Sequence, residues 1–309
     1  MDLPCCSRLC SNMVYHLRSP GRLYPGRPGR GLFIFGPVWR RISDFIKDCA
    51  LTTLSPKTQP LSPRSLRRLA GQAIGDFAMI RAGDRILLGL SGGKDSLSLL
   101  HILRDLRQRA PIHFELGVVT IDPQAEGFDP SVLVPYVESL GIRYHYVREP
   151  IVELAHKHMD NDSFCAFCSR MRRGLMYRTA REHGYQVLAL GQHLDDLAES
   201  FMMSAFHGGR LQTMKAHYQI DAGDLRVIRP LVYVRERQTA AFAQAVGLPV
   251  IYENCPACFA KPTQRQHMKT LLAQEEQQNP RLFRTLLTTL RPLMSAGLAD
   301  VTAVAEQPE

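Results

Sequence analysis

The spacing of hydrophobic and polar residues predicts alternating strands and helices along most of the chain. From Arg64 to Met79, the apolar residues Leu66, Leu69, Ala73 and Phe77 fall on one helical face. Short apolar runs bounded by turn residues predict buried strands: Arg85–Leu90, Leu116–Ile121, Tyr144–Arg148, Val187–Gly191, Val227–Leu231 and Pro249–Tyr252. Further helices are predicted at Ser96–Arg109, Ser131–Leu140, Ser169–His183, Asp195–Phe206, Arg235–Val246, Thr263–Gln277 and Pro280–Met294.

This order predicts an α/β fold, in which a mostly parallel sheet carries helices on both faces. Ligands of such sheets bind beyond the carboxyl ends of the strands. The pattern also divides the chain into a folded domain over residues 61–295, an N-terminal extension over residues 1–60 and a tail over residues 296–309. Both terminal segments lack a clear period and are predicted to be disordered.

Basic residues are unevenly distributed between the N-terminal extension and the folded domain. The 309 residues include 38 Lys and Arg against 29 Asp and Glu, and such a basic balance favours nucleic acid as a partner. Nine basic and three acidic residues lie in residues 1–60, so most of the basic excess belongs to the extension. Any RNA-binding surface of the folded domain must therefore be a local cluster of basic residues. That Arg-rich extension could be a transit peptide, but a disordered extension is the favoured interpretation. No apolar run reaches membrane-spanning length, and we expect a cytoplasmic protein without a membrane segment.

A glycine-rich loop follows the first predicted strand. Residues 89–96 read Gly-Leu-Ser-Gly-Gly-Lys-Asp-Ser, and the next helix begins there. Adjacent glycines let the backbone approach an anion, and the helix presents free N–H groups and the positive end of its dipole. The loop is therefore predicted to bind phosphate. It is not a Walker A loop, because that pattern needs Ser or Thr after the Lys, whereas Asp95 follows Lys94.

This loop resembles the SGGxDS signature of the PP-loop ATP pyrophosphatases. The resemblance implies an adenine-nucleotide alpha-hydrolase-like fold and cleavage of ATP between its α- and β-phosphates, with adenylation of a substrate oxygen. Mg²⁺ would neutralise the phosphates. The implied ATP-binding residues are Ser91, Gly92, Gly93, Lys94, Asp95 and Ser96.

Four of the eight cysteines form two Cys-x-x-Cys pairs, Cys165 with Cys168 and Cys255 with Cys258. Each pair has the spacing of two thiolates on one metal. Four thiolates would suit zinc, whereas three would hold a [4Fe–4S] cluster with one iron open to sulfur. Buried structural cysteines and a redox dithiol are the alternatives that do not involve a metal.

Longer segments resemble the tRNA 2-thiocytidine synthetase family of PP-loop enzymes: residues 165–180, 190–196, 227–231 and 258–266. The match implies Cys165, Cys168 and Cys258 as ligands of a [4Fe–4S] cluster, with Cys255 beside it. Two features depart from the family pattern. Gln192 replaces the first His of a Gly-His-His segment, and residues 259–261 read Phe-Ala-Lys instead of Gly-Ser-Gln.

Two charged groups accompany these motifs. Arginines cluster around the helix that follows the first cysteine pair, and they predict contacts to tRNA or ATP, although a solvated helix face is the plainer explanation: Arg170, Arg172, Arg173, Arg178 and Arg181. We predict Arg172 as catalytic. Asp195 and Asp196 open a helix, where carboxylates cap N–H groups, bind Mg²⁺ or move protons. Asp195 is predicted as catalytic, and His193 as a phosphate contact.

The resemblance implies ATP-dependent replacement of the C2 oxygen of a tRNA cytidine, at position 32, by sulfur. A cysteine desulfurase would supply the sulfur, and a homodimer is expected. Three alternatives stay open. They are a PP-loop sulfurtransferase that makes 2-thiouridine, a zinc-binding RNA-binding protein without catalysis, and an amide-forming adenylating enzyme that does not need the cysteines.

Overall fold

The computed structural model describes residues 62–158, 164–251 and 264–295. The predicted extension at residues 1–60, the tail from residue 296, and both Cys255 and Cys258 lie outside the described residues. Within these ranges, no helix is long and apolar enough to cross a membrane.

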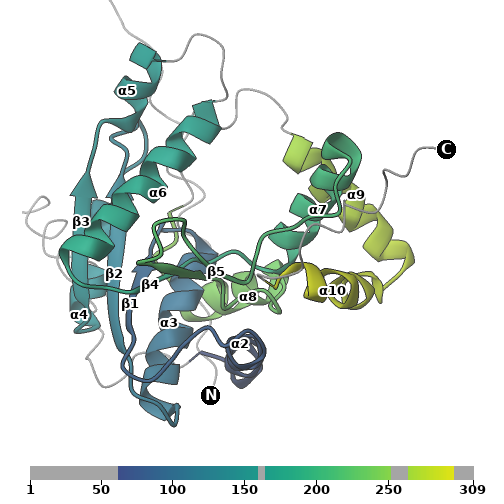
Figure 1. Cartoon of the computed structure of the whole chain (residues 1–309), viewed down its shortest axis with the longest axis horizontal. Helices are drawn as coiled ribbons and strands as arrows, with labels where there is room; N and C mark the ends of the chain where they lie inside the picture. Colours follow the sequence, from purple (N-terminus) through teal and green to yellow (C-terminus); the bar gives the residue numbers. More distant parts are fainter. Residues whose placement is uncertain (1–61, 159–163, 252–263, 296–309) are drawn as a thin grey trace, which may run out of the picture. The chain divides into compact units, whose positions relative to one another are not determined.

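A six-stranded sheet in the order β3-β2-β1-β4-β6-β5 forms the centre of the fold (Figure 1). Its strands are β1 (Arg85–Gly89), β2 (Glu115–Asp122), β3 (Arg143–Arg148), β4 (Val187–Ala189), β5 (His217–Gln219) and β6 (Arg226–Ile228). Every neighbouring pair is parallel except β5 and β6. The predicted α/β fold with a mostly parallel sheet is confirmed.

Helices follow most strands in sequence. They are α2 (Arg64–Asp76), α3 (Lys94–Arg109), α4 (Leu133–Ser139), α5 (Ile151–His158), α6 (Phe164–Glu182), α7 (Leu194–Gly208), α8 (Glu236–Val246), α9 (Gln264–Gln278) and α10 (Leu282–Leu293). A single 3₁₀ turn, η2 (Pro130–Val132), precedes α4. Most predicted helix limits lie within a few residues of these.

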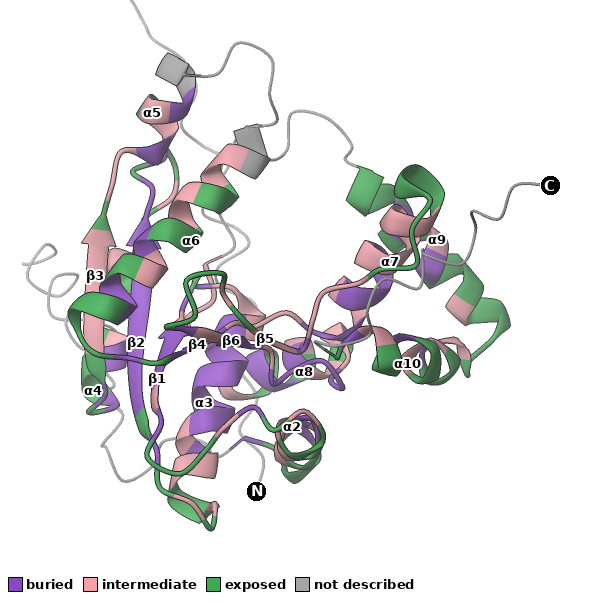
Figure 2. Ribbon diagram, viewed as in Figure 1, coloured by how far each residue is buried: buried purple, intermediate pink, exposed green. Residues whose placement is uncertain are grey.

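Side-chain alternation along the strands builds one core on each face of the sheet. In β1, Ile86 and Leu88 join the core formed with α2, α3, α4 and α8, whereas Leu87 joins the core beneath α5 and α6. In β4, Leu188 likewise faces α6. Helix α3 is buried along most of its length (Figure 2). Helices therefore cover both faces, as predicted.

Several predicted elements were wrong. Residues 249–251 form no strand; instead the Ile251 N–H donates to the Gly92 carbonyl at 3.0 Å, and Tyr252 lies outside the described residues. The helix from Arg64 ends at Asp76, because Ala78 has a φ of 47°. The helix predicted from Ser169 begins at Phe164, so Cys165 and Cys168 lie in its first turns rather than before it. Helix α5 and strand β5 were not predicted; β5 reads His-Tyr-Gln and has no apolar run.

Gly117 in β2 gives a test of the packing under α6. A Cβ at this position would lie 2.1 Å from the Tyr185 hydroxyl oxygen, and Tyr185 is only 5% exposed. We predict that Gly117→Ala lowers the free energy of unfolding by about 1–3 kcal/mol, because the buried ring has to shift. Urea denaturation measures this change.

Gly71 in α2 is the matched control. A Cβ there meets no atom within 4 Å, so Gly71→Ala should leave stability unchanged or raise it by about 0.5–1 kcal/mol through helix propensity. A Gly117→Ala protein as stable as the Gly71→Ala protein would contradict the described packing of Tyr185.

Candidate active site

The loop between β1 and α3 is closed by hydrogen bonds of its own serines. Gly92 has a φ of 84°, which favours glycine, and a Cβ there would lie 2.5 Å from Ile251 Cδ1. The Ser91 N–H donates to Ser96 Oγ at 3.2 Å, and Ser96 Oγ donates to the Gly93 carbonyl at 3.0 Å. The two serine hydroxyls thus hold the loop closed. No side chain caps α3, so its first N–H groups face an incoming anion.

Lys94 sits at the start of α3 between two carboxylates. Its Nζ lies 3.0 Å from Asp95 Oδ2 and 2.9 Å from Glu236 Oε1. Burial lowers the pKa of Lys94, but the two carboxylates outweigh burial and the net shift is upward. Lys94 is therefore a cation held in place before any ligand arrives.

His193 links the loop to α7. Its Nε2 lies 3.6 Å from Asp95 Oδ2, and its backbone N–H donates to Asp196 Oδ2 at 2.9 Å in a capping box. Burial opposes ionisation of Asp95, but His193, Thr239 and Lys94 lower its pKa to about 2. Burial likewise opposes protonation of His193, yet the neighbouring aspartates raise its pKa. Each member of the pair thus favours the charged form of the other.

A cavity of about 240 Å³ opens beside these residues, between α3, α7, α9 and the start of α8. Charged and polar side chains line it: Asp95, His193, Asp196, Glu199, Glu236, Arg265, Gln266 and Lys269. Ion pairs cross the cavity, since Arg265 bonds to Glu199 at 2.8 Å and Lys269 bonds to Glu236 at 2.7 Å. The sequence interpretation missed the residues from α8 and α9. Their signal was a basic pair four residues apart, Arg265 and Lys269.

Asp195 does not line this cavity. Its carboxylate accepts from Arg235 Nε at 3.1 Å and from the Glu236 N–H at 2.8 Å. Arg235 also forms two bonds to Glu276, at 2.6 and 2.8 Å. Asp195 therefore ties α7 to the amino end of α8, and Asp196 is the member of the pair that faces the cavity. The catalytic role of Asp195 stays a prediction.

Helix α6 carries the predicted sulfur-binding residues. Position 165 lies in its first turn, and Cys168 is a half-buried thiol packed against the core beneath this helix. Arg172 Nη2 donates to the Ile121 carbonyl at 3.4 Å, near the carboxyl end of β2. Arg172 is thus at the same edge of the sheet as the loop after β1. Cys258 is outside the described residues, and within those residues no group of three or more metal-binding side chains occurs.

The later arginines of α6 have ordinary surface partners. Arg181 forms two bonds to Asp224, at 2.6 and 3.1 Å, and Arg178 lies 3.9 Å from Glu182. The explanation as a solvated helix face fits this end of the helix. The RNA-binding prediction is better placed on its first half.

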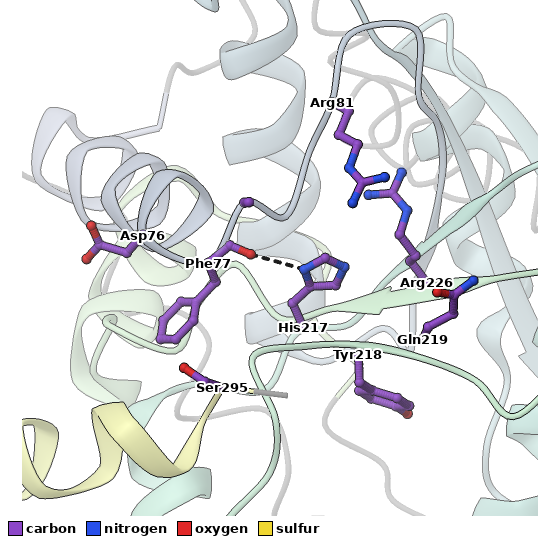
Figure 3. Close-up of a pocket in the computed structure, with 9 residues that line it drawn as sticks. Asp76, Phe77, Arg81, His217, Tyr218, Gln219, Arg226 and Ser295 are labelled. Atoms are coloured by element: carbon purple, nitrogen blue, oxygen red, sulfur yellow. Dashed lines mark hydrogen bonds between the residues drawn. The ribbon is translucent and has the colours of Figure 1, made fainter. Parts of the chain in front are cut away.

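A larger cavity of about 470 Å³ lies elsewhere, at the edge strand β5 and the end of α2 (Figure 3). His217 Nδ1 donates to the Phe77 carbonyl there at 3.0 Å, and Arg226 pairs with Asp84. Arg226 begins β6, so this cavity is at the amino edge of the parallel strands, opposite the loop at residues 91–96. Two of its charged groups are paired, Arg226 with Asp84 and Asp76 with Arg291, and we do not assign the active site to it.

Comparisons with known proteins agree with this geometry. A family model described as a PP-loop domain matches residues 64–256. The tRNA-cytidine(32) 2-sulfurtransferase of Geobacter sulfurreducens is 40% identical over 239 residues, which cover 77% of this chain and 93% of that protein. The protein of the same name from Syntrophotalea carbinolica is 42% identical over 250 residues, or 79% and 96% of the two chains.

A solved structure shares the fold. It is the U34-tRNA thiolase NcsA from Methanococcus maripaludis with its [4Fe-4S] cluster, at a TM-score of 0.61 and 22% identity over 76% of this chain and 79% of that chain. The sequence relatives, the matched domain and the loop geometry point to one family. The chain belongs to the PP-loop family and, within it, to the family of the tRNA-cytidine(32) 2-sulfurtransferases.

Proposed function

We propose that this chain uses ATP to activate the C2 oxygen of cytidine 32 in tRNA and replaces that oxygen with sulfur. One observation carries the proposal. The phosphate-binding loop after β1 and Arg172, four residues after Cys168 on α6, lie at the same carboxyl edge of one sheet. Relatives about 40% identical over three quarters of the chain are named for this reaction.

The loop residues support the ATP half of the reaction. The uncapped first turn of α3 and the cation of Lys94 would hold phosphate oxygens as negative charge leaves with pyrophosphate. His193, Thr239 and Lys94 lower the pKa of Asp95 to about 2 against the effect of burial, and an ionised carboxylate here would serve as an oxygen ligand of Mg²⁺. Asp196 adds a second carboxylate on the same cavity. Arg265 and Lys269 on the same cavity would pair with pyrophosphate oxygens.

Arg172 and Asp195 have different parts in this proposal. The Arg172 guanidinium is anchored to the sheet edge through a carbonyl, which leaves its other N–H groups to stabilise the activated base. Asp195 holds Arg235 and the start of α8, and thereby positions Glu236 against Lys94. We assign it a positioning role.

The cysteines would hold the sulfur-carrying group. Positions 165 and 168 are one turn apart on α6, and the surroundings of Cys168 are apolar, with Met171 and Leu190 in the same core. Such surroundings suit thiolates on a cluster better than hydrated ions. With Cys258 as the third ligand, a [4Fe–4S] cluster would supply one iron that is open to sulfur. The fold is one on which the Methanococcus maripaludis thiolase carries such a cluster.

We also predict two partners, a cysteine desulfurase as the sulfur source and a second copy of the chain in a homodimer. We predict a cytoplasmic location for the protein. The alternative functions predict a different metal content or a different modified nucleoside. A zinc protein would be colourless and free of iron, and a 2-thiouridine enzyme would leave cytidine unmodified.

Cysteine substitution tests the proposed reaction. We expect Cys168→Ala, Cys165→Ala and Cys258→Ala proteins to lose the iron of the anaerobically purified enzyme and to form no 2-thiocytidine. The measurement is mass spectrometry of nucleosides from tRNA incubated with each protein, beside an iron and sulfide assay. Cys49→Ala, outside both pairs, is the control and should retain both. Thiolation by the Cys258→Ala protein would refute that ligand, and 2-thiouridine as the sole product would refute the substrate.

Gly191 tests the ATP half separately. A Cβ there would lie 3.1 Å from the Ser96 backbone nitrogen and 3.2 Å from its Cα, so Gly191→Ala must displace the start of α3. We predict that kcat/KM for ATP falls on the order of 10–100-fold, because a small misplacement of reacting groups has effects of this size. The Gly71→Ala protein is the matched control. An unchanged kcat/KM in the Gly191→Ala protein would show that the close contact between Gly191 and the Ser96 backbone does not affect the use of ATP.

A further inference from the structure

Arg229 is a guanidinium whose described contacts are all neutral. It directly follows β6, and its Nε donates to Gln192 Oε1 at 3.0 Å. Its Nη1 donates to the Lys215 carbonyl, and its guanidinium carbon lies 5.4 Å from the centre of the Tyr218 ring. No described carboxylate forms an ion pair with it. By contrast, Arg226 pairs with Asp84 and Arg235 pairs with Asp195 and Glu276.

This positive charge is partly withdrawn from water. Burial lowers the pKa of Arg229, the Tyr218 hydroxyl raises it and the nearby Arg173 lowers it again, so that the net shift is downward. A cation in such a place is unfavourable unless an anion joins it. Arg173 is an exposed residue of α6 that also forms no ion pair with a carboxylate of the described chain. Within the described residues, Arg229 and Arg173 are thus two neighbouring guanidiniums without a carboxylate partner.

The position of this region relates it to the reaction. Strands β1, β4 and β6 are neighbours, and the loop at residues 91–96, Gln192 and Arg229 follow their carboxyl ends in that order. Two strand spacings separate the first from the last, or about 10 Å. Arg173 lies five residues after Cys168 on α6. Arg173 therefore lies on the predicted sulfur-binding helix, and Arg229 lies at the same sheet edge as the predicted activating loop, outside that loop.

We propose that Arg229 and Arg173 bind a phosphate of the tRNA backbone next to the target nucleotide, with Gln192 fixing the direction of the Arg229 guanidinium. This inference rests on the proposed function, since it takes tRNA as the substrate. A backbone phosphate fits because guanidinium groups bind phosphate through paired N–H donors. The ATP phosphates have the loop after β1 as their own site. Gln192 is also where this chain departs from the Gly-His-His pattern of its family.

Two substitutions in the full-length enzyme test the proposal. Arg229→Gln removes the charge. Gln192→Glu keeps the size and the acceptor but gives Arg229 a carboxylate partner that competes with phosphate. We expect each to weaken binding of an unmodified tRNA transcript on the order of tenfold, because a charged hydrogen bond is lost or neutralised. Arg229→Gln should also reduce the slope of log K against log salt by about 1.

Arg181→Gln is the matched control, because it removes the same charge from a residue that Asp224 already pairs. It should change tRNA binding less than twofold. Thermal melting of each protein confirms that it is folded, and binding of a non-hydrolysable ATP analogue is measured in parallel. The proposal is overturned if Gln192→Glu and Arg229→Gln bind tRNA as the control does. It is equally overturned if they weaken the ATP analogue and leave tRNA unchanged. Because tRNA binding is measured without turnover, this test gives a result whether or not the protein thiolates tRNA.

Discussion

The carboxyl edge of the parallel sheet is the constraint on which the rest of the site depends. The loops that follow parallel strands all lie at one edge of the sheet. At this edge, the loop at residues 91–96 leads into the uncapped amino end of α3. Backbone approach at this edge is close. Gly92 packs on Ile251 and Gly191 packs on Ser96, and side chains at either position would collide with those neighbours. Packing therefore favours glycine at both positions, independently of any ligand.

Charge is distributed unevenly around this edge. On the side of α7, α8 and α9, carboxylates and cations are paired in a network that runs from Lys94 through Glu236 to Lys269. Such a network fixes side chains before a ligand binds, and its carboxylates can accept a metal ion. On the side of α6 and β6, Arg229 and Arg173 have no carboxylate of the described residues as partner. The first arrangement suits a metal–pyrophosphate group, and the second suits an RNA backbone.

Local pattern was sufficient to predict the fold, since the period of Arg64–Asp76 and the apolar runs of β1 and β2 are direct consequences of burial. Helix α5 and strand β5 were missed, and β5 lacks the apolar run that marked the other short strands. The residues 249–251 were misinterpreted as a strand because they are apolar, but their backbone N–H groups donate to Leu248 and Gly92 and pair with no strand. Motif chemistry found the phosphate loop, but it could not separate Asp195 from Asp196. Only the position of Arg235 shows which carboxylate is engaged elsewhere.

We propose that the loop at residues 91–96 binds the ATP that activates a tRNA base for sulfur transfer. The most direct test is to quantify AMP, pyrophosphate and 2-thiocytidine from one incubation of the anaerobically purified enzyme with ATP, tRNA and a sulfur source. We predict one AMP and one pyrophosphate for each 2-thiocytidine formed, and negligible AMP when tRNA is omitted. Formation of ADP and phosphate, or thiolation without ATP cleavage, would contradict it.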